Sequence, residues 1–124
     1  KKPSPMTNEE FAEYFKARTK QWAVAVVKYV MTLPETPVTR VVRYQLIKSS
    51  TSTAANYRSS CRARSKPEFH AKIGVALEEA DESLFWMEFI QESGIDDSQT
   101  LHQLMQENLE IISILAKTRK NSDR

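Results

Sequence analysis

The stretch that decides the fold runs from Ser49 to Phe69 and reads SSTSTAANYRSSCRARSKPEF. Its first half is a run of small side chains, which allow two helices to approach each other closely. In its second half, Ser65 is followed three positions later by Glu68, a spacing that predicts the start of a new helix. Between these two parts lie three arginines, Arg58, Arg62 and Arg64. The stretch therefore predicts a junction between two helices, and this junction carries positive charge.

Helix signals continue on both sides of the junction. Thr36 followed by Pro37 predicts a helix over 37–64, since a threonine N-cap and a proline in the first turn are typical of helix starts. Ser65 opens a helix over 66–93, and Gly94 supplies its stop. Apolar residues recur along both ranges at helical spacing, so both ranges bury one face.

Two further helices flank this pair. Thr7 and Glu10 form a capping box for a helix over 8–33, which Pro34 ends. Thr100 with Gln103 predicts the cap of a last helix over 100–119. With only two glycines in 124 residues, the chain lacks the turns that an all-β fold needs. We therefore expect one all-α domain over 1–124, an up-down-up-down antiparallel four-helix bundle.

Two segments carry more apolar surface than a single core can use. Residues 22–30 read WAVAVVKYV and residues 84–90 read LFWMEFI, and both are apolar nearly all round the helix. Surplus apolar surface favours self-association, and hence a homo-oligomer. The candidate interface residues are Trp22, Val26, Tyr57, Phe85, Trp86 and Phe89.

Charge is strongly segregated along the chain, although the net charge is only +2. Residues 34–72 hold eight basic and two acidic side chains, whereas residues 73–110 hold ten acidic and no basic ones. This segregation indicates either that neighbouring helices neutralise each other or that a basic face is left free for an anionic ligand. The candidate nucleic-acid-binding residues, acting through phosphate contacts, are Arg40, Arg43, Arg58, Arg62, Arg64 and Lys66.

Sequence motifs for catalysis or cofactor binding are absent. His70 and His102 stand alone, without the Glu-x-x-His spacing that builds metal sites in helical bundles. The two glycines belong to no phosphate-binding loop. We therefore expect no metal, no cofactor and no enzymatic activity.

The single cysteine, Cys61, excludes an intramolecular disulfide and is interpreted as a small buried helix residue. Because no apolar run is long enough to span a membrane and no signal segment is recognised, we expect a cytoplasmic protein without a membrane partner.

Residues 45–90 resemble the signature of the four-helix-bundle proteins encoded in intervening sequences of bacterial 23S rRNA genes. The shared elements are Gln45-Leu46, Ala55-Asn56-Tyr57-Arg58, Arg62-Ala63, Ser65 before Glu68-Phe69, Ile73, and Ala76-Leu77-Glu78-Glu79-Ala80 leading to Glu82. One departure is the Tyr57-Arg58 pair, because many of these proteins have an isoleucine, alanine and glutamate after the asparagine.

The resemblance implies a homopentamer of bundles around a central pore, with no associated enzymatic activity. Related accessory proteins of diversity-generating retroelements work with a reverse transcriptase and nucleic acid through basic surface, which by analogy suggests RNA, DNA or a reverse-transcriptase-like protein as partner. The alternative is a purely structural or protein-interaction module. In that module the arginines make intersubunit ion pairs with Glu78, Glu82 or their neighbours.

Overall fold

The computed structural model of the protein describes residues 5–122, and the regular structure in that range is entirely helical. The helices are α1 (Asn8–Val30), α2 (Pro37–Ser60), α3 (Lys66–Glu92) and α4 (Gln99–Asn121). Four helices and an all-α fold, both predicted from the sequence, are confirmed over the described range.

Hydroxyl side chains start all four helices. At α1, the Thr7 hydroxyl accepts a hydrogen bond from the Glu10 amide (3.1 Å) and the Glu10 carboxylate accepts one from the Thr7 amide (2.9 Å), which confirms the capping box. Thr36 and Ser65 cap α2 and α3 as predicted. The cap of α4 was predicted wrongly, because it is Ser98 and not Thr100.

The carboxylate of Asp96 explains the earlier start of α4. It accepts a hydrogen bond from the Ser98 hydroxyl at 2.7 Å, while the Ser98 oxygen accepts one from the Leu101 amide at 3.3 Å. This chain of bonds orients Ser98 as the N-cap.

Helix ends differ more than helix starts from the prediction. α1 ends at Val30 instead of Leu33, because the Thr32 and Leu33 amides bond to carbonyls three residues back and tighten the chain into a turn. α2 ends at Ser60 instead of Arg64 for the same reason. Two of the three junction arginines, Arg62 and Arg64, therefore lie in the α2–α3 loop and not on a helix.

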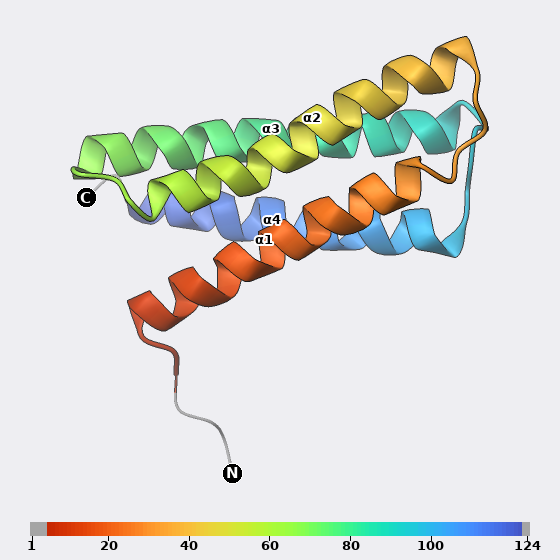
Figure 1. Ribbon diagram of the computed structural model, residues 1–124. Helices are drawn as coiled ribbons and strands as arrows, with labels where there is room; N and C mark the ends of the chain where they lie inside the picture. The colour runs from red at the N-terminus through yellow and green to blue at the C-terminus, as the bar shows by residue number, and fades with distance from the viewer. Residues whose placement is uncertain (1–4, 123–124) are drawn as a thin grey trace.

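The helices lie side by side, and consecutive helices contact each other around the molecule, with α4 returning to α1 (Figure 1). The colours in Figure 1 show α1 and α3 running in one direction and α2 and α4 in the other. The α1–α2 and α3–α4 loops lie at one end, and the α2–α3 loop lies at the other end, where α1 begins and α4 ends. We call this second end the junction end.

A single apolar core runs between the helices. Its largest fully buried apolar side chains come from all four helices: Phe15, Val26, Val30, Val42, Leu46, Ile73, Met87, Ile90, Leu101, Ile111 and Leu115.

The α2–α3 pairing is the most extensive of the helix pairings. Small side chains lie buried along both helices, among them Ser49, Ala76, Ala80 and Ser83. The Ser83 hydroxyl donates to the Ser49 hydroxyl at 2.8 Å, a contact that requires the two helices to lie close together. The close approach predicted for the Ser-rich stretch is thus found against α3.

Candidate nucleic-acid and oligomer interfaces

The six basic residues predicted to bind nucleic acid fall into two groups at opposite ends of α2. Arg40 and Arg43 lie in its first two turns, whereas Arg58 lies in its last turn and is followed by Arg62, Arg64 and Lys66 at the junction. α2 has 24 residues, which corresponds to a length of about 36 Å. The structure therefore does not bring these six residues together into one patch.

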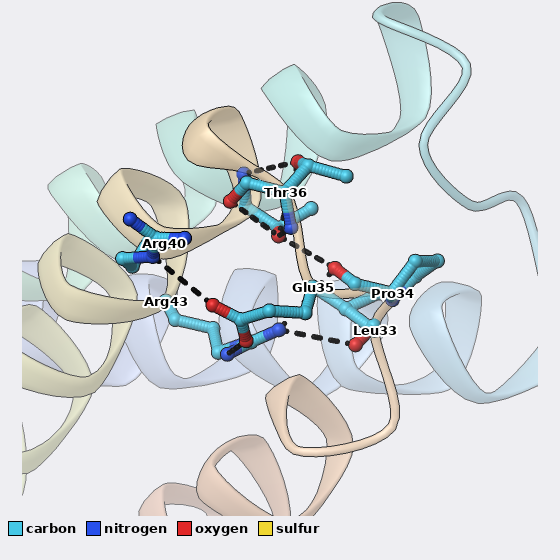
Figure 2. Close-up of polar contacts among 7 residues, drawn as sticks. Leu33, Pro34, Glu35, Thr36, Arg40 and Arg43 are labelled. Atoms are coloured by element: carbon cyan, nitrogen blue, oxygen red, sulfur yellow. Dashed lines mark hydrogen bonds and ion pairs between the residues drawn. The ribbon is translucent and has the colours of Figure 1, made fainter.

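Arg40 and Arg43 are both bound to Glu35 in the α1–α2 loop (Figure 2). Arg40 Nε lies 3.0 Å from one carboxylate oxygen, and Arg43 Nη1 lies 2.5 Å from the other. The hydrogen bonds from Arg43 and then Arg40 lower the pKa of the Glu35 carboxyl, so Glu35 stays charged.

Arg43 also fixes the loop backbone. Its Nη2 donates to the carbonyl oxygens of Leu33 and Pro34, at 3.1 and 3.2 Å (Figure 2). The guanidinium groups of Arg40 and Arg43 thus hold the α1–α2 loop, and their positive charge is offset by Glu35.

The positive charge of the second group is not offset by a carboxylate of the described residues. Arg58, Arg62, Arg64 and Lys66, which we call the junction cluster, are all exposed. None of their side chains forms an ion pair with another residue of the described range 5–122. Glu68 is the nearest acidic residue in sequence, and it accepts a 3.4 Å hydrogen bond from the Arg64 backbone amide. Four adjacent cations with no carboxylate partner among the described residues form a surface suited to phosphate groups.

A hollow of about 1330 Å³ opens beside the junction cluster, between the four helices at the junction end. Phe11, Tyr57 and Phe69 contribute its aromatic walls, and Arg64 and Lys66 lie at its edge. Tyr57 is itself buried, with its ring 4.7 Å from that of Phe15 in a T-shaped contact, and this burial raises the pKa of the Tyr57 hydroxyl.

The predicted burial of Cys61 is wrong. Its thiol lies in the turn after α2 and is exposed at the wall of the hollow, because the helix ends one residue earlier.

The six predicted interface residues also separate into two sets. Trp22, Val26 and Tyr57 are at most 4 % exposed within the single chain. The Trp22 indole donates to the Leu104 carbonyl at 3.3 Å, which fixes it against α4. These three side chains belong to the core of the protomer, so they offer no surface to a second copy.

The other three remain at the surface of α3. Phe85 is 54 % exposed, Phe89 is 37 % exposed, and Trp86 is half-buried against the core. Their rings contact one another, with centroids 5.0 Å apart for Phe85 and Trp86 and 5.7 Å apart for Trp86 and Phe89. An exposed cluster of three aromatic rings is the kind of surface that protein interfaces use.

A groove between α1 and α2 was not predicted from the sequence. It has a volume of about 770 Å³, and its lining includes Val24, Val27 and Met31 of α1 and Ala54 and Ala55 of α2. The all-round apolar pattern of residues 22–30 was the available signal, since it showed that α1 has apolar side chains outside the core.

Within residues 5–122, no group of three or more histidine, cysteine, aspartate or glutamate side chains is placed to hold a metal ion. None of the described helices is long and apolar enough to span a membrane.

A family model and a solved structure are similar to this chain. The family model described as the 23S rRNA-intervening sequence protein matches residues 14–117. A crystal structure of a protein of unknown function from the S23 ribosomal protein family of Bacteroides thetaiotaomicron is 25 % identical, with a TM-score of 0.78, and the match covers 88 % of this chain and 97 % of that one. No curated protein matches the chain in sequence. Since the family model spans most of the chain, this four-helix protein belongs to the 23S rRNA-intervening sequence protein family.

Proposed function

We propose that the protein is a non-catalytic homo-oligomer, a pentamer of up-down-up-down bundles, which binds nucleic acid or a nucleoprotein through the junction cluster. The observation that carries this proposal is the difference between the two basic groups. Glu35 occupies Arg40 and Arg43, whereas Arg58, Arg62, Arg64 and Lys66 have no ion-pair partner in the described range. Of the six residues predicted to bind nucleic acid, only the four at the junction end are therefore without an ion-pair partner in the described range.

Phosphate contacts by such a cluster position a nucleic acid without reading its bases. In an oligomer the cluster is repeated once per protomer, so several weak contacts act on one strand. By analogy with the retroelement accessory proteins, a reverse-transcriptase-like protein that carries nucleic acid is a nucleoprotein partner consistent with this surface.

The test is a salt titration of binding to a labelled DNA duplex. Wild-type affinity should fall steeply with salt, and Arg62→Ala/Arg64→Ala should weaken binding and reduce the slope of log K against log salt by about 2, roughly 0.9 per lost phosphate contact. The matched control is Arg40→Ala/Lys48→Ala, which removes two cations of α2 away from the junction end and should leave the slope unchanged. Both residues are exposed, as are Arg62 and Arg64. If the junction variant binds as tightly as wild type, the nucleic-acid proposal is wrong.

A second candidate function is a structural or protein-interaction module. It is favoured by Glu78 and Glu82 of α3, which are exposed and form no ion pair within residues 5–122. If the junction arginines bind these carboxylates of a second copy, Arg62→Ala/Arg64→Ala dissociates the oligomer in light scattering. In that case the wild-type protein should not bind nucleic acid at physiological salt.

A further inference from the structure

The hollow at the junction end is lined by one large apolar side chain from each of the four helices. These are Phe11 of α1, Tyr57 of α2, Phe69 of α3 and Ile114 of α4. Figure 1 shows that the start of α1 stands apart from the ends of α2 and α4, where this hollow lies. Its volume of about 1330 Å³ exceeds the roughly 300–1,000 Å³ of pockets for drug-sized molecules, so it is large enough for a nucleotide. Phosphate contacts by the junction cluster leave this apolar lining without a role.

Two aromatic rings border the hollow from different helices. Phe11 and Phe69 lie in the first turns of α1 and α3, and these two helices do not pack against each other within residues 5–122. Both rings are half-buried, so each keeps some exposed surface. The Phe11 ring is held in place by stacking on Phe15, with centroids 5.7 Å apart and planes 15° apart.

Phe69 differs from Phe11 in having no aromatic partner among the described residues. Its ring is therefore free to stack on a planar group inside the hollow. Aromatic side chains beside a basic surface are the usual platform for the bases of a single-stranded nucleic acid.

Cations border the same hollow. Arg64, Lys66 and Lys117 belong to its lining, which contains one carboxylate, Glu9. All four side chains are exposed, and none forms an ion pair with a described residue. An aromatic lining with a cationic edge matches a nucleotide, because its base is planar and its phosphate is anionic.

The extent of the positive charge favours a strand over a free nucleotide. Arg58 and Arg62 continue the basic surface beyond the hollow, so the junction cluster and Lys117 together present five exposed cations. One nucleotide has a single phosphate group for them, whereas a strand supplies a phosphate at every step. The strand has to be unpaired, since the bases of a duplex are already paired and stacked on their neighbours.

We propose that the hollow binds an unpaired base of a single-stranded nucleic acid, stacked on Phe69, while the junction cluster and Lys117 hold the phosphates beside it. Stacking of this kind tolerates any sequence, because every base has a flat π-face. The inference rests on nucleic-acid binding in the proposed function, and it adds which form of nucleic acid is bound. A duplex meets the phosphate contacts but not the contact to the base.

Two labelled strands of equal length test this inference with the full wild-type chain. One is a short oligothymidylate, and the other is an abasic strand, which has the same phosphates and no bases. At one salt concentration, fluorescence anisotropy should show that oligothymidylate binds roughly tenfold more tightly, the effect of stacking one base. Free thymidine monophosphate should compete only at far higher concentration, and equal competition would overturn the assignment of a strand.

Phe69→Leu removes the ring and keeps an apolar side chain of similar size. It should lower the affinity for oligothymidylate roughly tenfold and leave the affinity for the abasic strand unchanged. The matched control is Tyr44→Leu, which removes an aromatic ring that is 64 % exposed on α2 and lies outside the hollow. This control should bind both strands as the wild type does.

Cys61 supplies a readout that needs no variant. It is the only cysteine of the chain, it is exposed, and it belongs to the lining of the hollow. Saturating oligothymidylate should slow the alkylation of Cys61 by iodoacetamide several-fold. The abasic strand at saturation should slow it much less, because it brings the same phosphates but leaves the hollow open.

The outcomes separate this inference from the proposed function. Equal affinity for the two strands, or equal protection of Cys61, would overturn the base contact and leave phosphate binding by the junction cluster intact. A wild-type chain that binds neither strand nor the duplex would overturn the proposed nucleic-acid binding, and the base contact with it.

Discussion

Tyr29 links α1 to the loop between α3 and α4. Its hydroxyl donates a 2.7 Å hydrogen bond to Asp96 Oδ2, the carboxylate that also orients Ser98 at the start of α4. Burial, and then the bond to Asp96, raises the pKa of Tyr29 above its ordinary value of 10.0. The bonds from Ser98 and Tyr29 lower the pKa of Asp96 below 3.8.

Because of these shifts, the effect of Tyr29→Phe on the free energy of unfolding should depend on pH. A raised pKa means that Tyr29 stabilises the fold fully below pH 10 and that this stability is lost as the pH rises further. The variant should therefore lose about 1 kcal/mol at neutral pH, a figure reduced for the exposure of Asp96, and show a shallower loss of stability above pH 10. Urea midpoints from pH 7 to about 12 measure both effects.

Tyr44→Phe is the control for this measurement, because Tyr44 is 64 % exposed and should leave the midpoint at neutral pH unchanged. An alkaline slope that is equal in Tyr29→Phe and wild type would show that Tyr29 does not couple stability to pH.

The contact between α2 and α3 depends on small side chains. Ser49 is fully buried against Ser83, so any larger side chain at position 49 has to push the two helices apart. Ser49→Leu should therefore destabilise the protein by about 2–3 kcal/mol through overpacking. Ser49→Ala keeps the helices close, and Ser83 keeps its bond to the Glu79 carbonyl, so this control should cost within about 1 kcal/mol.

Chemical denaturation of the two variants measures the difference. If leucine is tolerated as well as alanine, close packing at this point is not what holds α2 against α3.

The existence of the four helices, and the starts of α1, α2 and α3, could be predicted because their signals are local. Thr7, Thr36 and Ser65 bond to backbone amides three residues away, so a short window of sequence contains the whole interaction. Asn108 was not among the residues predicted to be buried. Asn108 lies four residues after Leu104 on the buried stripe of α4, and it is fully buried, with its amide donating to the Ala80 carbonyl at 3.0 Å.

The sequence could not predict which candidate residues are buried in the core, which are paired with a carboxylate and which are exposed. These differences depend on contacts between elements that are far apart in the sequence. The apolar pattern of residues 22–30 gives no sign that Trp22 faces α4 while Val24 stays exposed. Likewise, the capture of Arg40 and Arg43 by Glu35 depends on the path of the α1–α2 loop. Only a structure distinguishes these arginines from those of the junction cluster.

Across the protomer, the four helix pairings differ in extent. The α1–α4 pairing is the least extensive, and Arg18 holds it by two hydrogen bonds to Glu107, at 2.6 and 2.7 Å, and one to Glu110, at 2.7 Å. The bonds from Arg18 lower the pKa of Glu110, so this carboxylate keeps its charge to a lower pH than an ordinary glutamate. In the proposed oligomer each bundle binds its neighbours only in the folded state.

Assembly should for this reason stabilise the fold, and the Tm should depend on protein concentration. If unfolding dissociates the oligomer, a tenfold increase in concentration stabilises each protomer by about 1 kcal/mol, which corresponds to a rise in Tm of roughly 3–5 °C. Calorimetry of wild type across a hundredfold range of concentration measures this rise. A variant whose protomers are monomeric in light scattering should melt at one temperature throughout that range, below the wild-type value. A wild-type Tm independent of concentration would mean that association with other copies does not stabilise the folded bundle.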